Sequence, residues 1–333
     1  MKSDVTFVSA GLQLAGHLYT PGETTSDRRP GIVVSHPASG VKEQTAGLYA
    51  ERLAHKGFVT LAFDAAHWGE SAGEPRFLED PFRRIEDIKN AVTFLSLCAE
   101  VDPGRIGALG ICASGGYVIP AAATDRRIKA VATVSASDLG SWFRDGLGRT
   151  QDREVLHTLL HEASAARIEE AQGKPVRRLR TNPDSEPEYG EDKKSVIRHV
   201  HDGWEYYRTS RAYHPRTENW FALRSIDLIA QFDAFRHIDL ISPRPLLMVA
   251  GTEAITDYFT REAIARAREP KELFWIDGAG HVDLYDKNEY VPSVVSKVAD
   301  FFALNLTPTR RSRLNEPSGE YPPQPIPIGE PLR

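Results

Sequence analysis

The stretch LGICASGGYV (109–118) has the residue types and the spacing of a tight turn that presents a nucleophile. Such a turn leads from a strand into a helix, and it needs small residues just before and after the nucleophile because larger side chains would collide. Centring the turn on Cys112 places only glycine or serine at those positions, whereas centring it on Ser114 places Tyr117 there. We therefore predict that Cys112 is the nucleophile and that Ser114, early in the helix, hydrogen-bonds to backbone.

A cysteine in this turn suits attack on the carbonyl carbon of an ester or thioester, which would form an acyl-enzyme. A helix N-terminus and a nearby imidazole both increase the thiolate fraction of such a thiol. The amide of Ala113 is the first expected donor to the oxyanion. The second donor is expected in the loop SHPASGVKEQ (35–44), where Pro37 has no N–H and Ala38 is therefore the candidate, followed by Ser39.

The expected base is His281, which stands in FWIDGAGHVDLYD (274–286) directly after an apolar segment near the C-terminus. Histidine is the usual general base at neutral pH, and a carboxylate commonly orients it. We predict that Glu253, after the preceding strand, is this carboxylate. Asp138 and Asp257 remain alternatives, since each follows or lies near the end of a predicted strand.

The periodicity of the chain predicts the sheet that must position these residues. Residues 4–20 alternate between polar and apolar around Ala10-Gly11, as two antiparallel strands would. Short apolar runs then alternate with amphipathic segments, which indicates a mostly parallel α/β sheet flanked by helices. The predicted strands lie at 31–37, 58–64, 105–110, 128–136, 244–251 and 272–277, and the predicted helices at 43–57, 83–99, from 113, 258–268 and 291–304.

The alternating pattern stops between residues 138 and 240, which divides the chain. This stretch holds a predicted helix at 153–172, with Val155 and Leu156 on its apolar face, and many aromatic residues, so we expect a helical lid or cap. The core that contains the sheet would comprise 1–137 and 241–306. The tail 307–333 is rich in proline and is expected to be extended, as an arm that would contact another copy in a homo-oligomer.

These features together resemble the α/β-hydrolase superfamily, and in particular its dienelactone-hydrolase-like branch. The resemblance is carried by residues 36–76, by LGICASGGYV and by GAGHVDLYD, and it implies a cysteine in the nucleophile turn. Fungal polyketide acyltransferases and thioesterases are similar along the same length. The glutamate that holds the thiol in dienelactone hydrolases corresponds to about Pro37 here, and the insertion is larger, which argues against a dienelactone substrate.

The composition limits the classes of partner. The net charge is −5, with no basic stripe, so we expect neither nucleic acid nor a membrane surface as partner. The two cysteines, Cys98 and Cys112, are too few for a disulfide framework, and no long apolar run appears, so we expect a cytoplasmic protein. His157 and His161 lie four residues apart but lack the metal-binding order, and we expect no metal and no cofactor.

The main prediction is an ester or thioester hydrolase that uses Cys112, His281 and Glu253 and needs only a small-molecule acyl substrate. The first alternative is an acyltransferase that moves a polyketide-like acyl chain from a carrier thioester, presented by an acyl carrier protein, to an alcohol. The second alternative is a non-catalytic binding protein on the same fold. His67 and Trp68 are further candidates for contact with substrate, because the loop that carries them shapes the mouth of the pocket in such folds.

Overall fold

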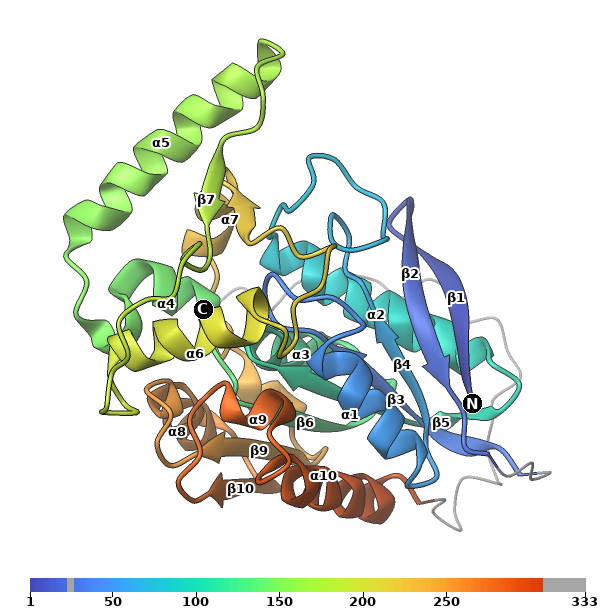
Figure 1. Ribbon diagram of the computed structural model, residues 1–333. Helices are drawn as coiled ribbons and strands as arrows, with labels where there is room; N and C mark the ends of the chain where they lie inside the picture. Colours follow the sequence, from blue (N-terminus) through green and yellow to red (C-terminus); the bar gives the residue numbers. More distant parts are fainter. Residues whose placement is uncertain (23–26, 308–333) are drawn as a thin grey trace, which may run out of the picture.

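An eight-stranded sheet forms the centre of the protein (Figure 1) in the computed structural model, which describes residues 1–22 and 27–307. Its strand order is β1-β2-β4-β3-β5-β6-β9-β10. The strands are β1 (Lys2–Ser9), β2 (Leu12–Tyr19), β3 (Arg29–Ser35), β4 (Val59–Phe63), β5 (Val101–Ile111), β6 (Ile128–Val134), β9 (Leu246–Gly251) and β10 (Lys271–Ile276). All neighbours from β4 to β10 pair in parallel, and the sheet confirms the predicted mostly parallel α/β architecture.

The first two strands form the predicted antiparallel hairpin. Its turn residues Ala10 and Gly11 both have positive φ, at 38° and 83°. Turns of this kind match the right-handed twist of the strands that they join. The hairpin then pairs antiparallel with β4 through β2 and leaves β1 at the edge of the sheet.

Helices cover both faces of the parallel sheet, and they account for its continuous apolar strands. Every residue of β4, for example, is buried, as expected when neither face meets water. The helices α2, α3 and α8 lie on one side, and α1 and α10 pack together on the other. The helices of the core are α1 (Thr45–Ala54), α2 (Pro81–Leu97), α3 (Ala113–Thr124), α8 (Asp257–Arg266), α9 (Asp283–Asp286) and α10 (Val291–Asn305).

A long segment separates β6 from β9, although these strands are neighbours in the sheet. Its helix α5 extends away from the body of the molecule, while α6 lies near α9 (Figure 1). Its elements are α4 (Leu139–Asp145), η1 (Leu147–Arg149), α5 (Arg153–Ala171), β7 (Arg178–Arg180), α6 (Val196–Arg208), β8 (Trp220–Ala222), α7 (Ser225–Ala230) and η2 (Ile238–Ile241). We call residues 138–240 the inserted segment.

The inserted segment departs from the sequence prediction in two respects. Helix α5 forms where expected and buries Ala163 and Ala166, but Val155 of its predicted apolar face is 44% exposed. Helix α6 was not predicted, because the side that it buries includes the charged residues Arg198 and Asp202, which hide the helical period. These two charged side chains can be buried because they form an ion pair with each other, at 2.7 Å.

None of the helices in the described ranges combines the length and the apolar character that crossing a bilayer requires. The predicted proline-rich arm, 307–333, lies outside the described residues apart from its first residue.

Candidate active site

Cys112 occupies the single residue between the end of β5 and the start of α3. Its backbone is left-handed, with φ 57° and ψ −122°, a conformation that costs energy for any residue with a Cβ. The Cys112 N–H donates to Val134 O at 3.0 Å, and the Cys112 carbonyl accepts from the amides of Gly115 and Ser137 at 2.8 and 3.0 Å. The surrounding backbone therefore holds the strained turn that the spacing of small residues predicts.

The small residues of this turn are required by close contact. A Cβ on Gly110 would lie 2.0 Å from the carbonyl oxygen of Ser114, and one on Gly115 would lie 2.7 Å from Cα of Ala136. Ser114 is fully buried, and its hydroxyl donates to the carbonyl oxygen of His36 at 2.5 Å. The expected backbone hydrogen bond of Ser114 is thus confirmed, and this hydroxyl ties α3 to the loop that follows β3.

His281 follows β10 and lies at the same edge of the sheet as Cys112, as expected for residues after the carboxyl ends of parallel strands. Its Nδ1 is 2.6 Å from Oγ1 of Thr256, and its Nε2 is 3.0 Å from the hydroxyl of Tyr285. Burial and the neighbouring imidazole of His199 lower the pKa of His281 well below its usual value. The ring is therefore neutral at neutral pH, which is the form that accepts a proton.

The hydrogen-bond partner of Nδ1 is Thr256 and none of the predicted carboxylates. Glu253 lies in the same loop, but only its backbone N–H is engaged, donating to Ala279 O at 3.0 Å. Within residues 1–22 and 27–307, the carboxylate of Glu253 has neither a hydrogen bond nor an ion pair. Thr256 stands three residues later and could have been found by testing every polar side chain of this loop.

The two alternative carboxylates serve other contacts. Asp138 accepts hydrogen bonds from the amides of Gly140 and Ser141 at the start of α4, and burial raises its pKa to about 6. Asp257 pairs with Lys194 and Arg261, each at 3.2 Å. Both carboxylates thus stabilise the structure around the site, and neither contacts the imidazole of His281.

Tyr285 brings the thiol and the imidazole together, and sequence reasoning missed it. Its hydroxyl is 3.0 Å from Nε2 of His281 and interacts with the side chain of Cys112. Burial raises the pKa of Cys112, and the contacts of its side chain with Tyr285 and with the Ala113 amide partly offset this effect. At neutral pH the resting site therefore holds a thiol and a neutral imidazole, not a thiolate–imidazolium pair.

The predicted oxyanion donors lie beside the sulfur. The amide of Ala113, the first residue of α3, is directed at the side chain of Cys112. Ala38 and Ser39 line the same cavity as Cys112, and Ser39 has a positive φ of 57°. In the described part of the chain the Ala38 amide meets no acceptor, so it is available to a substrate. Their roles as donors remain predictions.

A cavity of about 460 Å³ lies over these residues. Cys112, His281 and Tyr285 are among its lining residues, and the inserted segment supplies most of the others. These are chiefly apolar and aromatic, and they include Trp142, Phe143, Leu159, Leu179, Val196 and Phe221. The only imidazole among the lining residues besides His281 belongs to His199 of α6, whose ring centre is 5.1 Å from that of His281. Such walls favour an apolar ligand.

His67 and Trp68 do not reach this cavity. Trp68 is fully buried, and its indole N–H donates to Leu78 O at 3.2 Å. Nδ1 of His67 lies 3.0 Å from Pro75 O. The two side chains therefore hold the loop after β4 in place, and the structure does not bring them to the predicted substrate.

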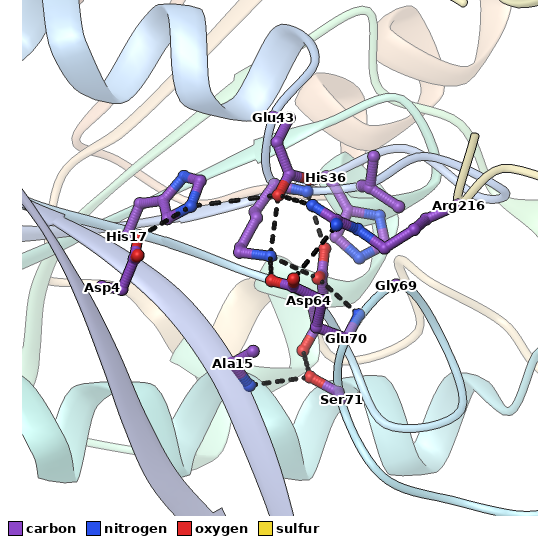
Figure 2. A network of polar contacts seen from close by, with 12 residues as sticks. Asp4, Ala15, His17, His36, Glu43, Asp64, Gly69, Glu70, Ser71 and Arg216 are labelled. Atoms are coloured by element: carbon purple, nitrogen blue, oxygen red, sulfur yellow. Dashed lines mark hydrogen bonds and ion pairs between the residues drawn. The ribbon is translucent and has the colours of Figure 1, made fainter. Parts of the chain in front are cut away.

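A second polar cluster includes the end of the loop that joins β3 to α1 (Figure 2). Oxygens of Glu43, Asp64 and Glu70 lie within 4.8 Å of one another, as the ligands of a metal ion would. Nζ of Lys42 already occupies this position, at 2.8, 2.8 and 2.6 Å from the three carboxylates. Burial lowers the pKa of Lys42, but the carboxylates outweigh it and raise this pKa above its usual value. The cluster therefore anchors the loop with an internal ammonium group.

The arrangement of strands, turn and histidine can be compared with known proteins. Residues 14–137 match the sequence model of the dienelactone hydrolase family. YcjY of Escherichia coli (strain K12) is 38% identical over 311 residues, which span 92% of this chain and 100% of that protein. The chain belongs to the dienelactone hydrolase family. It is accordingly an enzyme with the α/β-hydrolase fold.

Structures of family members agree with this assignment. The crystal structure of hypothetical protein PA2218 from Pseudomonas aeruginosa has a TM-score of 0.85 and 36% identity, and it covers 92% of this chain and 94% of that chain. A more distant relative, Polyketide transferase grgF of Penicillium sp., is 25% identical over 309 residues, which are 92% of this chain and 97% of that protein. The proteins to which this chain is similar thus include one that is named as a transferase.

Proposed function

We propose that this chain is an acyl-transfer enzyme that cleaves an ester or thioester through an acyl-enzyme on Cys112. One observation carries the proposal. A cysteine in a strained nucleophile turn shares a hydroxyl contact with a neutral, buried imidazole at the base of an apolar cavity. Membership of the dienelactone hydrolase family also supports this type of chemistry, but it does not by itself specify the substrate.

In the first step, the sulfur of Cys112 attacks the carbonyl carbon, and its proton passes to His281. Because both groups start neutral, the proton leaves as the C–S bond forms, in general-base catalysis. The carbonyl oxygen becomes an oxyanion, for which the Ala113 and Ala38 amides are the expected donors. His281 then returns the proton to the departing alkoxide or thiolate as the bond to it breaks. The acyl group is left on Cys112.

In the second step, an acceptor with an O–H group attacks the thioester of the acyl-enzyme. His281 takes the acceptor proton, the C–S bond breaks, and the sulfur recovers a proton from His281. Water as acceptor makes the enzyme a hydrolase. The hydrogen bond from Nδ1–H to Thr256 keeps the tautomer in which Nε2 is free to act as base.

Acyl transfer to an alcohol is a second candidate, and a specific observation favours it. The cavity walls from the inserted segment are largely apolar, so they exclude water from an acyl-enzyme and accommodate a hydrophobic acyl chain. The similarity to Polyketide transferase grgF along nearly the whole chain points the same way. The carrier could then be a thioester on a small thiol or on an acyl carrier protein.

A series of p-nitrophenyl esters and acyl thioesters of increasing chain length tests the proposal. Release of the leaving group and the intact mass of the protein are followed together. Fast turnover in water supports hydrolysis, and an adduct of one acyl group that persists until an alcohol is added supports transfer. If none of the donors gives either release or adduct at Cys112, the proposed function is wrong.

A further inference from the structure

The hydroxyl of Tyr285 stands between the two groups that the proposed reaction uses. It is 3.0 Å from Nε2 of His281, and Tyr285 lines the same cavity as Cys112 and interacts with the Cys112 side chain. In the described ranges, Nε2 has no hydrogen-bond partner other than this hydroxyl. The proton that leaves the sulfur thus meets Tyr285 on its way to the imidazole.

The hydrogen-bonding capacity of this hydroxyl fits a position in a chain of proton transfers. A phenol donates one hydrogen bond and accepts two. Donation to Nε2 of His281 leaves the oxygen free to accept a hydrogen bond from the thiol of Cys112. All of these side chains are buried, and hydrogen bonds are electrostatically stronger in such surroundings than in water.

Several contacts hold Tyr285 in this position. Its carbonyl oxygen accepts from the hydroxyl of Thr45 at 2.9 Å, and the carbonyl oxygen of Leu284 accepts from the hydroxyl of Tyr49 at 2.7 Å. Its ring packs against that of Tyr206, with the ring centres 5.1 Å apart. The short helix α9 is thereby fixed to the N-terminal part of α1, and the phenol is a rigid part of the site.

We propose that Tyr285 is a catalytic residue that relays the proton between Cys112 and His281, an inference that rests on the proposed function. As sulfur attacks the acyl carbon, the S–H proton moves to the oxygen of Tyr285 while the phenolic proton moves to Nε2. Tyr285 ends neutral, and no net charge stays on it. When the leaving group departs, His281 transfers the proton that it gained to the departing alkoxide or thiolate.

The environment of Tyr285 favours a concerted relay over one with a free phenolate. Burial raises the pKa of Tyr285 well above its usual value, and the neighbouring Cys112 and Tyr207 act in the same direction. A discrete phenolate would therefore be unfavourable, and both protons must move together. The same burial also keeps His281 neutral and ready to accept.

The experiment compares Tyr285→Phe with Tyr49→Phe, a matched control that removes another buried hydroxyl next to α9. Two rates are measured from pH 6 to 10. The first is acylation by a p-nitrophenyl ester, and the second is alkylation by iodoacetamide, read by mass spectrometry on the Cys112 peptide so that Cys98 does not contribute. His281→Ala and the double variant Tyr285→Phe/His281→Ala complete the set.

The relay predicts that Tyr285→Phe lowers the acylation rate on the order of 10²-fold, within the usual contribution of general acid–base groups. Its alkylation profile shifts to higher pH, as does that of His281→Ala. The double variant is no slower than the slower single variant, because the two residues act as one unit. Tyr49→Phe removes one contact that positions α9 but keeps the relay hydroxyl, so its loss of acylation rate is smaller than that of Tyr285→Phe by about tenfold or more.

Three results would overturn the relay. If Tyr285→Phe acylates as fast as the unaltered enzyme while His281→Ala does not, the imidazole and the thiol exchange the proton directly. If Tyr285→Phe and Tyr49→Phe lose equal activity, the effect is structural. If Tyr285→Phe shifts the alkylation profile but His281→Ala does not, Tyr285 only donates to the thiolate. If the unaltered enzyme accepts no ester, the proposed function fails, and the alkylation profiles still decide the relay.

Discussion

Two loops at the same edge of the sheet position the candidate site by different physical means. The turn after β5 is held by close backbone approach, since Gly110 and Gly115 each face atoms within 2.0 to 2.7 Å of a Cβ position. The loop after β9 acts through one side-chain hydrogen bond, between Thr256 and Nδ1 of His281. The first allows almost no change of residue, whereas the second needs only a hydroxyl or carboxylate at the right distance. Close packing therefore restricts the residue types in the turn after β5, whereas the hydrogen bond to His281 could be made by several polar residue types in the loop after β9.

The strongest test of the turn is Cys112→Ala, which should abolish the acyl adduct altogether. Ser114→Ala should retain most of it, because that hydroxyl holds backbone and faces no substrate, although loss of a buried hydrogen bond should lower the free energy of unfolding by about 1–3 kcal/mol. Intact mass after exposure to an ester and chemical denaturation measure the two effects. Cys98→Ala is the control and should keep the full adduct. An adduct in Cys112→Ala, or its loss in Ser114→Ala, would contradict the register of the turn.

Removal of the imidazole should have the next largest effect. His281→Ala should lower the acylation rate on the order of 10³-fold, because nucleophile and base act together. Stopped-flow release of p-nitrophenol measures this rate. A loss of less than tenfold would mean that another group takes the thiol proton.

The loop after β9 is tested by Thr256→Val, which keeps the shape of the side chain and removes the hydroxyl. Nδ1–H of His281 would then be buried without an acceptor, and we expect kcat/KM to fall by about 10- to 10²-fold. Glu253→Gln and Asp138→Asn are the controls and should stay within about twofold. A larger loss of kcat/KM in Glu253→Gln than in Thr256→Val would show that Glu253, as predicted from the sequence, orients His281. The contrast drawn between the two loops would then be wrong.

The pH dependence of acylation should show the smallest effect. The pKa of His281 is lowered by burial and by His199, so the imidazole is neutral and active above a value that lies well below 6.5. The rate should hold as the pH falls from 8 to 6.5 and decline only at more acidic pH, as the ring becomes protonated. His199→Ala should move this acid limb toward 6.5. A midpoint above 6.5 in the unaltered enzyme would disprove the assignment of the base.

The difference between the two loops also explains what the sequence could predict. The parallel sheet, the hairpin and the position of Cys112 follow from periodicity and from the need for small residues, which leave a clear pattern. His281 follows from its place after the last strand. Thr256 and Tyr285 leave no such pattern, since many polar residues lie near these strand ends and only the folded distances select among them. Helix α6 was missed for a related reason, because its buried Arg198 and Asp202 satisfy each other.

The ammonium group of Lys42 has a consequence for how this enzyme is handled. Three carboxylates with the spacing of metal ligands are bridged instead by an ammonium group that is covalently part of the chain, and Arg216 adds a second positive charge at Glu43 and Glu70. A chelator cannot extract it, and its supply does not vary with the medium. The loop with the Ala38 amide should therefore keep its shape whether divalent ions are scarce or abundant. The positive charge at this cluster is therefore a permanent part of the protein.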